Sequence, residues 1–222
     1  MNIERRNFLL LLAWLLVTLC LTLILTMRLE RTPEMQQSAN HSPVLPGQKS
    51  DAQEVINAAA SLLNAREFAA AETMLTSAVQ QHPGESDLWL LLGAAYYQQE
   101  KISQAEQSFR HLIKLQSDNA AAYNNLAETL VRQERLSEAQ TAIMHAIKLE
   151  PTNGEILLHA ASLYALQEKD QLALYHLKQA MDRGVRPETV SRYKELVRLL
   201  ERPDFMNYYR QQKNERSKRQ KL

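Results

Sequence analysis

The sequence predicts an all-α fold: a solenoid of four helical hairpins with a C-terminal capping helix, behind a single transmembrane helix. Three observations lead to this prediction. Apolar residues recur at helical spacing from residue 52 onward, one 34-residue pattern occurs four times without insertion, and residues 8–27 contain no charge. Only 5 glycines and 7 prolines occur in 222 residues, and no alternating β-branched run indicates a strand.

Residues 8–27 form the apolar stretch FLLLLAWLLVTLCLTLILTM. At about 1.5 Å per residue, a helix of this length spans about 30 Å, the thickness of a bilayer's hydrocarbon core. A cleaved signal peptide would have a shorter apolar region and a small-x-small cleavage site. A lipoprotein would have a small residue where Leu19 precedes Cys20. We therefore expect residues 1–28 to form an uncleaved single-pass membrane anchor.

The orientation of this anchor depends on a small charge difference. Two arginines stand on each side: Arg5, Arg6, Arg28 and Arg31. The amino terminus adds a positive charge to the short N-terminal side, which favours the cytoplasm for that side. We expect the repeats on the opposite face, which in a bacterium is the periplasmic side of the inner (cytoplasmic) membrane. Residues 29–50 are polar and proline-rich, so we expect a flexible linker there.

Residues 86–119 contain the most complete copy of the repeated pattern. Its apolar residues occur at helical spacing in two groups: Trp89, Leu92 and Tyr96, then Ala105, Phe109 and Leu112. Gly93 is small where two helices must approach closely. Ser103 and Glu106 have the spacing of a capping box that would start the second helix. One such hairpin leaves an apolar side too large to expose to water, so we expect further copies to stack on it.

The four copies are residues 52–85, 86–119, 120–153 and 154–187. The small residue of the second helix is alanine in every copy: Ala71, Ala105, Ala139 and Ala173. We expect helix pairs at 53–65 and 67–80, 87–99 and 102–115, 121–133 and 136–149, and 155–167 and 170–182. Four copies exceed the roughly three that a stable stack needs.

The pattern W-x2-L-G-x2-Y followed by A-x3-F, at Trp89, Leu92, Gly93, Tyr96, Ala105 and Phe109, resembles the tetratricopeptide repeat (TPR) family. The resemblance implies a right-handed superhelix whose first helices line a concave groove, which binds a peptide or helix of a partner. Carried over to this sequence, the groove positions are Ile56, Ala60, Leu63, Leu90, Ala94, Tyr97, Asn124, Glu128, Val131, Leu158, Ser162 and Ala165.

The expected groove differs from that of the family's chaperone-tail-binding members. Those members hold a terminal carboxylate with Lys and Asn, and Ile56 and Ala60 stand at these positions here. Because the groove is apolar in the first two repeats and mixed beyond them, we expect an apolar-leaning segment of another protein as partner. The alternative is that the chain's own terminal helix, or a second copy in a weak homo-oligomer, fills the groove.

Residues 188–209 follow the last copy and are expected to cap it. A helix over 188–200 would have one apolar face, Val190, Tyr193, Leu196, Val197 and Leu200, and a short helix would follow Pro203. Residues 210–222 contain six basic residues and one acid. Such a tail suits contact with anionic lipid or nucleic acid, but no aromatic residues interleave the charges. We expect a frayed, solvated terminus and no nucleic-acid binding.

The sequence contains no catalytic or metal-binding pattern. The single cysteine, Cys20, excludes an intramolecular disulfide and a cysteine-based zinc site. The six histidines, at positions 41, 82, 111, 145, 159 and 176, lack the spacing of metal ligands. No phosphate-binding glycine loop or nucleophile elbow is present. We expect no enzymatic activity, no cofactor and no metal.

Together these features predict a membrane-anchored scaffold or assembly factor that binds a protein partner in its groove. The arrangement resembles bacterial assembly factors with an N-terminal anchor and periplasmic repeats, such as those that serve cytochrome c maturation. Two alternatives stay open. One is a cytosol-facing adaptor similar to the anchored mitochondrial import receptors, although the missing clamp counts against it. The other is a regulatory subunit of a membrane enzyme.

Overall fold

The computed structural model of the chain describes residues 48–219. Nearly all of the described residues belong to one compact unit that begins at Lys49. The predicted anchor at residues 8–27 and residues 29–47 of the predicted linker lie outside the described range. Within that range, no helix is both long enough and apolar enough to cross a membrane.

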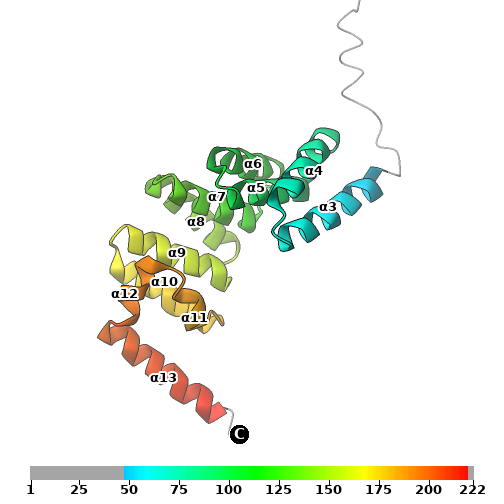
Figure 1. Cartoon of the computed structure of the whole chain (residues 1–222). Coiled ribbons are helices and arrows are strands. Elements are labelled where there is room, and N and C mark those ends of the chain that lie inside the picture. The colour runs from blue at the N-terminus through cyan, green and yellow to red at the C-terminus, as the bar shows by residue number, and fades with distance from the viewer. Residues whose placement is uncertain (1–47, 220–222) are drawn as a thin grey trace, which may run out of the picture. The chain divides into compact units, whose positions relative to one another are not determined.

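All regular structure between residues 48 and 219 is helical (Figure 1). The repeat helices are α3 (Gln48–Asn64), α4 (Phe68–Gln81), α5 (Ser86–Gln98), α6 (Ile102–Leu115), α7 (Ala120–Arg132), α8 (Leu136–Leu149), α9 (Gly154–Leu166) and α10 (Asp170–Asp182). They agree with the predicted helix pairs to within a few residues. The exception is α3, which begins at Gln48 and so includes residues 48–50 of the predicted linker. Asp51 in its first turn favours this earlier start, because a negative charge stabilises a helix N-terminus.

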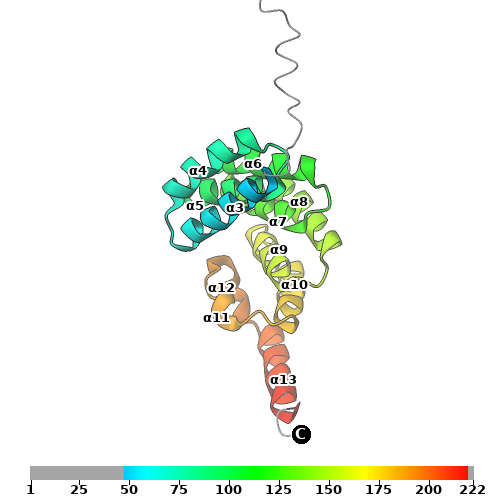
Figure 2. The ribbon, with the colours of Figure 1, turned by 90° about the vertical axis from the view of Figure 1, so that its right-hand side faces the viewer.

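The hairpins stack in chain order (Figures 1 and 2). Helix α4 contacts α5, α6 contacts α7, and α8 contacts α9, so the second helix of each hairpin packs on the first helix of the next. First helices also contact one another, α5 with α7 and α7 with α9. This arrangement confirms the predicted all-α solenoid for the described residues.

The two helices of each hairpin are joined by the same backbone turn. Its left-handed residue is Arg66, Glu100, Glu134 or Glu168, with φ of 63°, 58°, 59° and 60°. After Glu100, the amide of Lys101 donates to the Tyr96 carbonyl at 2.9 Å, which closes the C-terminus of α5. The predicted capping box is wrong. Ser103 lies inside α6, which begins at Ile102 without a side-chain cap.

Small residues allow the helices to approach closely. The alanine of each second helix is fully buried, as predicted: Ala71, Ala105, Ala139 and Ala173. Gly93 of α5 meets the same constraint, because a Cβ added there would lie 2.5 Å from the ring of Phe109. Leu92 and Leu112 are buried on the two contacting helices α5 and α6. The positions that the repeat pattern reserves for small residues are therefore places of close packing.

The C-terminal segment differs from the single helix predicted over residues 188–200. Two short helices form instead, α11 (Pro187–Val190) and α12 (Lys194–Leu200). Tyr193 between them is extended, with φ −97° and ψ 97°. The break changes which apolar residues are buried. The buried ones are Val190, Leu196 and Leu199, whereas Val197 is 41 % exposed. It also places the Tyr193 hydroxyl 2.9 Å from a ring nitrogen of His159 on α9.

Helix α13 (Pro203–Arg219) is longer than predicted. It contacts α10 and α12 (Figures 1 and 2). Phe205 is buried, and the Tyr208 hydroxyl donates to Asp182 at 2.6 Å. The helix continues through Arg219, so most of the predicted basic tail, residues 210–222, is helical where we expected a frayed terminus.

Candidate functional site

The groove positions predicted on α3 and α5 are half-buried. They are Ile56, Ala60, Leu63, Leu90, Ala94 and Tyr97. Other residues of α5, such as Leu92 and Ala95, are buried in the stack. The two sets alternate along the helix because adjacent residues face different sides. This part of the predicted groove therefore presents mostly apolar side chains with some of their surface exposed.

The predicted groove is closed at the fourth repeat. Leu158, Ser162 and Ala165 of α9 are buried rather than exposed to a partner. The C-terminal segment covers them: Arg198 donates to the Ala165 carbonyl at 3.2 Å, and Ser162 donates to a carboxylate oxygen of Glu195. Since α12 contacts α9 as α7 does, it occupies the place of a further repeat's first helix. The expectation of an open groove across all four repeats is wrong for this reason.

A pocket of about 570 Å³ lies where the open part of the groove meets this cover, and we call it the groove pocket. Four of the predicted groove residues line it: Tyr97, Glu128, Val131 and Ser162. Sequence reasoning missed the other polar residues of the lining, which are Arg132, His159, Arg192, Tyr193, Lys194 and Glu195. Leu158 lies elsewhere, in a second pocket of about 390 Å³ that it shares with Val185 and Tyr193. The structure thus brings the predicted residues of α5 and α7 together with residues that only the C-terminal fold supplies.

His159 is the central polar residue of the groove pocket. Its Nδ1 lies 2.8 Å from the side-chain oxygen of Asn124, a predicted groove residue that is itself buried. Because that oxygen can only accept, Nδ1 carries the proton and Nε2 is an acceptor. The Tyr193 hydroxyl donates to Nε2 at 2.9 Å, and Glu128 Oε1 lies 3.2 Å from the same nitrogen.

Burial disfavours the charged form of both ionisable groups of this contact. Burial lowers the pKa of His159 to about 4, so the imidazole is neutral near pH 7. Burial, together with the negative charge of Glu155, raises the pKa of Glu128 to about 7, although Arg132 acts in the opposite direction. Because the imidazole is neutral, the contact between Glu128 and His159 is not an ion pair. An ionised Glu128 would face a nitrogen lone pair.

Tyr97 and a basic rim complete the pocket. Arg132 Nε donates to the Tyr97 hydroxyl at 3.4 Å, and its guanidinium carbon lies 5.6 Å from the centre of the Tyr97 ring. Arg192 and Lys194 are exposed at the opposite side of the lining. Among the described residues, no cluster of His, Cys, Asp or Glu could hold a metal ion. The arrangement suits non-covalent binding by hydrogen bonds, aromatic faces and charge.

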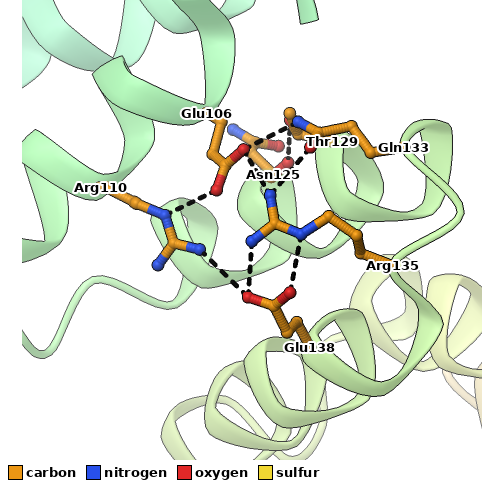
Figure 3. A network of polar contacts seen from close by, with 7 residues as sticks. All are labelled: Glu106, Arg110, Asn125, Thr129, Gln133, Arg135 and Glu138. Atoms are coloured by element: carbon orange, nitrogen blue, oxygen red, sulfur yellow. Dashed lines mark hydrogen bonds and ion pairs between the residues drawn. The ribbon is translucent and has the colours of Figure 1, made fainter. Parts of the chain in front are cut away.

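A second polar cluster, at the hairpin turns, joins consecutive repeats (Figure 3). Glu106 of α6 accepts hydrogen bonds from Arg110, Gln133 and Arg135, each at 2.8 Å. Arg135 also donates to both carboxylate oxygens of Glu138, at 2.7 and 2.6 Å. Burial alone would raise the pKa of Glu106, but these hydrogen bonds outweigh it and the pKa is lowered. We call this cluster the Glu106 network.

The Glu106 network recurs at the repeat period of 34 residues. The equivalent set one repeat earlier is Glu72, Gln99 and Lys101, and the set one repeat later is Gln140, Gln167 and Lys169. Lys101 donates to Glu72 at 2.5 Å, and Lys169 donates to Gln140 at 3.2 Å. Sequence reasoning missed these contacts because it compared only apolar and small positions across the copies. The same alignment of the polar positions would have found them.

Two segments of the sequence match models of the tetratricopeptide repeat family, residues 62–116 and residues 95–143. Curated proteins offer no match to the sequence. Among solved structures, the chain is similar to a thermophilic TPR protein of Thermus thermophilus, with 23 % identity and a TM-score of 0.61 over 72 % of this chain and 89 % of that one. It is similar to PilF of Pseudomonas aeruginosa, with 20 % identity and a TM-score of 0.62 over 73 % of this chain and 75 % of that one.

A third similar structure is the first TPR of Spaghetti (RPAP3) bound to the HSP90 peptide SRMEEVD. It has 18 % identity and a TM-score of 0.53, and covers 57 % of this chain and 99 % of that one. Residues 62–143 therefore contain tetratricopeptide repeats, and the solved structures show the same fold over a larger part of the chain. The prediction of a TPR solenoid is therefore confirmed for the part of the chain that these matches cover.

Proposed function

We propose that the protein is a membrane-anchored scaffold or assembly factor that binds a peptide or helix of another protein in its groove, on the periplasmic side of the inner membrane. The row of half-buried apolar side chains that leads into the groove pocket supports this most directly. Leu90 and Tyr97 of α5 and Val131 of α7 pack against the core yet keep exposed surface. Apolar surface next to a few convergent polar groups is typical of ligand-binding clefts.

The covered fourth repeat limits where a partner would lie. Because α12 contacts α9 and Asn124 is buried, the open groove positions are those of α3 and α5 and, on α7, Glu128 and Val131. A partner segment would run along these three first helices and end at the groove pocket. The peptide-bound structure of Spaghetti, which has the same fold, supports a peptide as the ligand class.

Site-specific photo-crosslinking tests the groove. A photoreactive residue placed at Leu90 or at Tyr97 in the full-length chain should crosslink to the same protein in cells. Tyr175 on α10 is the control position, because it is 57 % exposed and does not belong to the predicted groove set. Crosslinks from Tyr175 alone would show that partners bind another face.

The membrane part of the proposal depends on the uncharged stretch at residues 8–27. A reporter enzyme that is active only outside the cytoplasm, fused after Leu222, should be active. A fluorescent reporter that matures only in the cytoplasm should be dark at the same site. The opposite pattern would favour the cytosol-facing adaptor, and release of the chain from membranes by a salt wash would contradict the anchor.

A further inference from the structure

The groove pocket brings two tyrosines and one carboxyl group together. Tyr97 belongs to α5, Glu128 to α7, and Tyr193 to the turn before α12, and all three line the same pocket of about 570 Å³. Burial raises the pKa of both tyrosines, and the charge of Glu128 contributes in the same direction. Aromatic faces beside a carboxyl group are favourable surroundings for an organic cation.

Glu128 lacks the cationic partner that a partly buried carboxylate needs. Among residues 51–211, whose side chains the structure describes, it makes no ion pair with a lysine or an arginine, and its 3.2 Å contact is with His159. Buried charges in proteins are normally paired. The ionisable groups around Glu128 are Tyr97 on α5, Arg132 on its own helix, Glu155 and His159 on α9, and Arg192, Tyr193, Lys194 and Glu195 in the C-terminal segment. Arg192 and Lys194 are exposed, and the guanidinium of Arg132 lies over Tyr97 instead of pairing with Glu128.

We propose that the groove pocket binds the side chain of a lysine or arginine from the partner, with Glu128 as the counter-ion and Tyr97 and Tyr193 beside it. The inference rests on the proposed function, because the cation arrives as part of a segment that lies in the groove. Exposed basic residues stand at the rim: Arg132, Arg192 and Lys194. They favour a segment in which acidic residues flank the basic one, since like charges would repel. On binding, the Glu128 carboxyl group releases its proton to solvent and forms an ion pair with the cation.

The test uses the full-length chain and three synthetic peptides that differ at one position. The probe is acetyl-EALKLAE-amide, and its lysine is replaced by norleucine in one control and by glutamate in the other. In calorimetric titrations at pH 7, the lysine peptide should bind about tenfold more tightly than either control. Its binding heat should change with the ionisation enthalpy of the buffer. At a Glu128 pKa of about 7, about half a proton is released for each peptide bound.

Glu128→Gln is the matched variant, because its amide keeps the shape of the side chain and carries no charge. It should lose the preference for the lysine peptide and the dependence on buffer, while its unfolding temperature stays at or above that of the parent. Glu54→Gln removes the same charge from an exposed position of α3. It should bind the three peptides as the parent does.

Several outcomes would overturn the inference. They are equal affinities for the lysine and norleucine peptides, no binding of the lysine peptide at millimolar concentration, and an unchanged lysine preference in Glu128→Gln. Tightest binding of the glutamate peptide would also overturn it, because the basic rim would then be the binding site. The proposed function would be contradicted by a different result, the absence of crosslinks from Leu90 and Tyr97. If those crosslinks form but the lysine peptide is not preferred, the proposed function stands and this inference fails.

Discussion

Glu106 and Glu128 are partly buried carboxyl groups on two contacting helices, α6 and α7, and they differ in what surrounds them. The Glu106 side chain is 14 % exposed and the Glu128 side chain 31 % exposed. Burial acts to raise the pKa of both groups, but the pKa of Glu106 is lowered and that of Glu128 is raised to about 7. Three hydrogen-bond donors stabilise the ionised form of Glu106, and Glu128 has no comparable set of donors.

The difference separates two sides of the repeat stack. At the hairpin turns, the 34-residue period brings donors from the next repeat to each acceptor, so charges are satisfied within the chain. On the groove side, α9 and the C-terminal segment bury Glu128 without supplying a cation. We infer that the first arrangement stabilises the fold and that the second prepares a binding site. Each prediction below tests this division.

The largest effect is expected from adjacent residues of α5 that face the two sides. Gly93→Leu places a side chain where even a Cβ would lie 2.5 Å from Phe109, whereas Ala94 is half-buried at the groove. We expect Gly93→Leu to cost about 3 kcal/mol or more and Ala94→Leu less than about 1 kcal/mol. Thermal unfolding followed by circular dichroism measures both. Equal losses would show that the groove side is packed as tightly as the stack.

Removal of the Glu106 carboxylate should have the next largest effect. Glu106→Ala removes the acceptor of the Gln133 amide and one of the acceptors of Arg135, and we expect a loss of about 2 kcal/mol of stability. Glu128→Gln should leave stability near pH 7 unchanged or raise it, because it removes a carboxyl group that burial disfavours when charged. Urea unfolding of both variants gives the comparison. A larger loss in Glu128→Gln would contradict the division.

The pH dependence of stability should reveal the raised pKa of Glu128. The folded state holds its proton more tightly than the unfolded state between the usual pKa of 4.5 and about 7, so this group lowers stability as pH rises through that window. His159 acts oppositely between about 4 and 6.5, because the unfolded state is the one that binds the proton there.

The two contributions oppose each other between pH 4.5 and 6.5 in the parent chain. In Glu128→Gln the carboxyl group is absent, so of these two contributions to the pH dependence of stability only that of His159 remains. Glu128→Gln should therefore gain stability relative to the parent from pH 5 to pH 8, by about 2 kcal/mol after allowance for partial exposure. Unfolding temperatures at several pH values test this. Parallel curves for the two proteins would mean that Glu128 titrates normally.

The smallest effect is expected at the turns. Lys101 occupies in the earlier repeat the position that Arg135 occupies in the Glu106 network, and it makes an ion pair with Glu72. Arg135→Lys should therefore keep the contact with Glu106 and lose the two-point contact with Glu138, at a cost below about 1 kcal/mol. Chemical denaturation is sensitive enough to measure it. A loss as large as that of Glu106→Ala would show that the network depends on the guanidinium itself.

Much of the fold was predictable because one period governs it. The observed bounds of α6, α8 and α10 agree closely with the prediction, and the reserved alanines are buried. The period does not determine the C-terminal segment, where Tyr193 breaks the predicted helix and Val197 becomes exposed. There the packing on α9 decides the structure, and a helical pattern of apolar residues could not indicate it.

The candidate site was predictable only in part. The repeat positions correctly indicated half-buried residues such as Leu90 and Tyr97 on the first helices. They could not indicate that the chain covers its own fourth repeat. Asn124, His159 and Tyr193 are nevertheless spaced by 35 and 34 residues. A search for polar residues at the repeat period of 34 would have joined His159 to Tyr193, but not Asn124, whose spacing is one residue longer. The membrane anchor at residues 8–27 stays a prediction.

If the Glu106 side of the stack stabilises the fold and the Glu128 side binds the partner, one titration series should separate the two carboxyl groups. Acetyl-EALKLAE-amide is added at pH 7 to the parent chain, to Glu106→Gln and to Glu128→Gln, below the unfolding temperature of each. We predict that Glu106→Gln binds the peptide as the parent does although it unfolds at a lower temperature, and that Glu128→Gln binds it about tenfold more weakly although it is no less stable. Weaker binding by Glu106→Gln together with parental binding by Glu128→Gln would contradict the account.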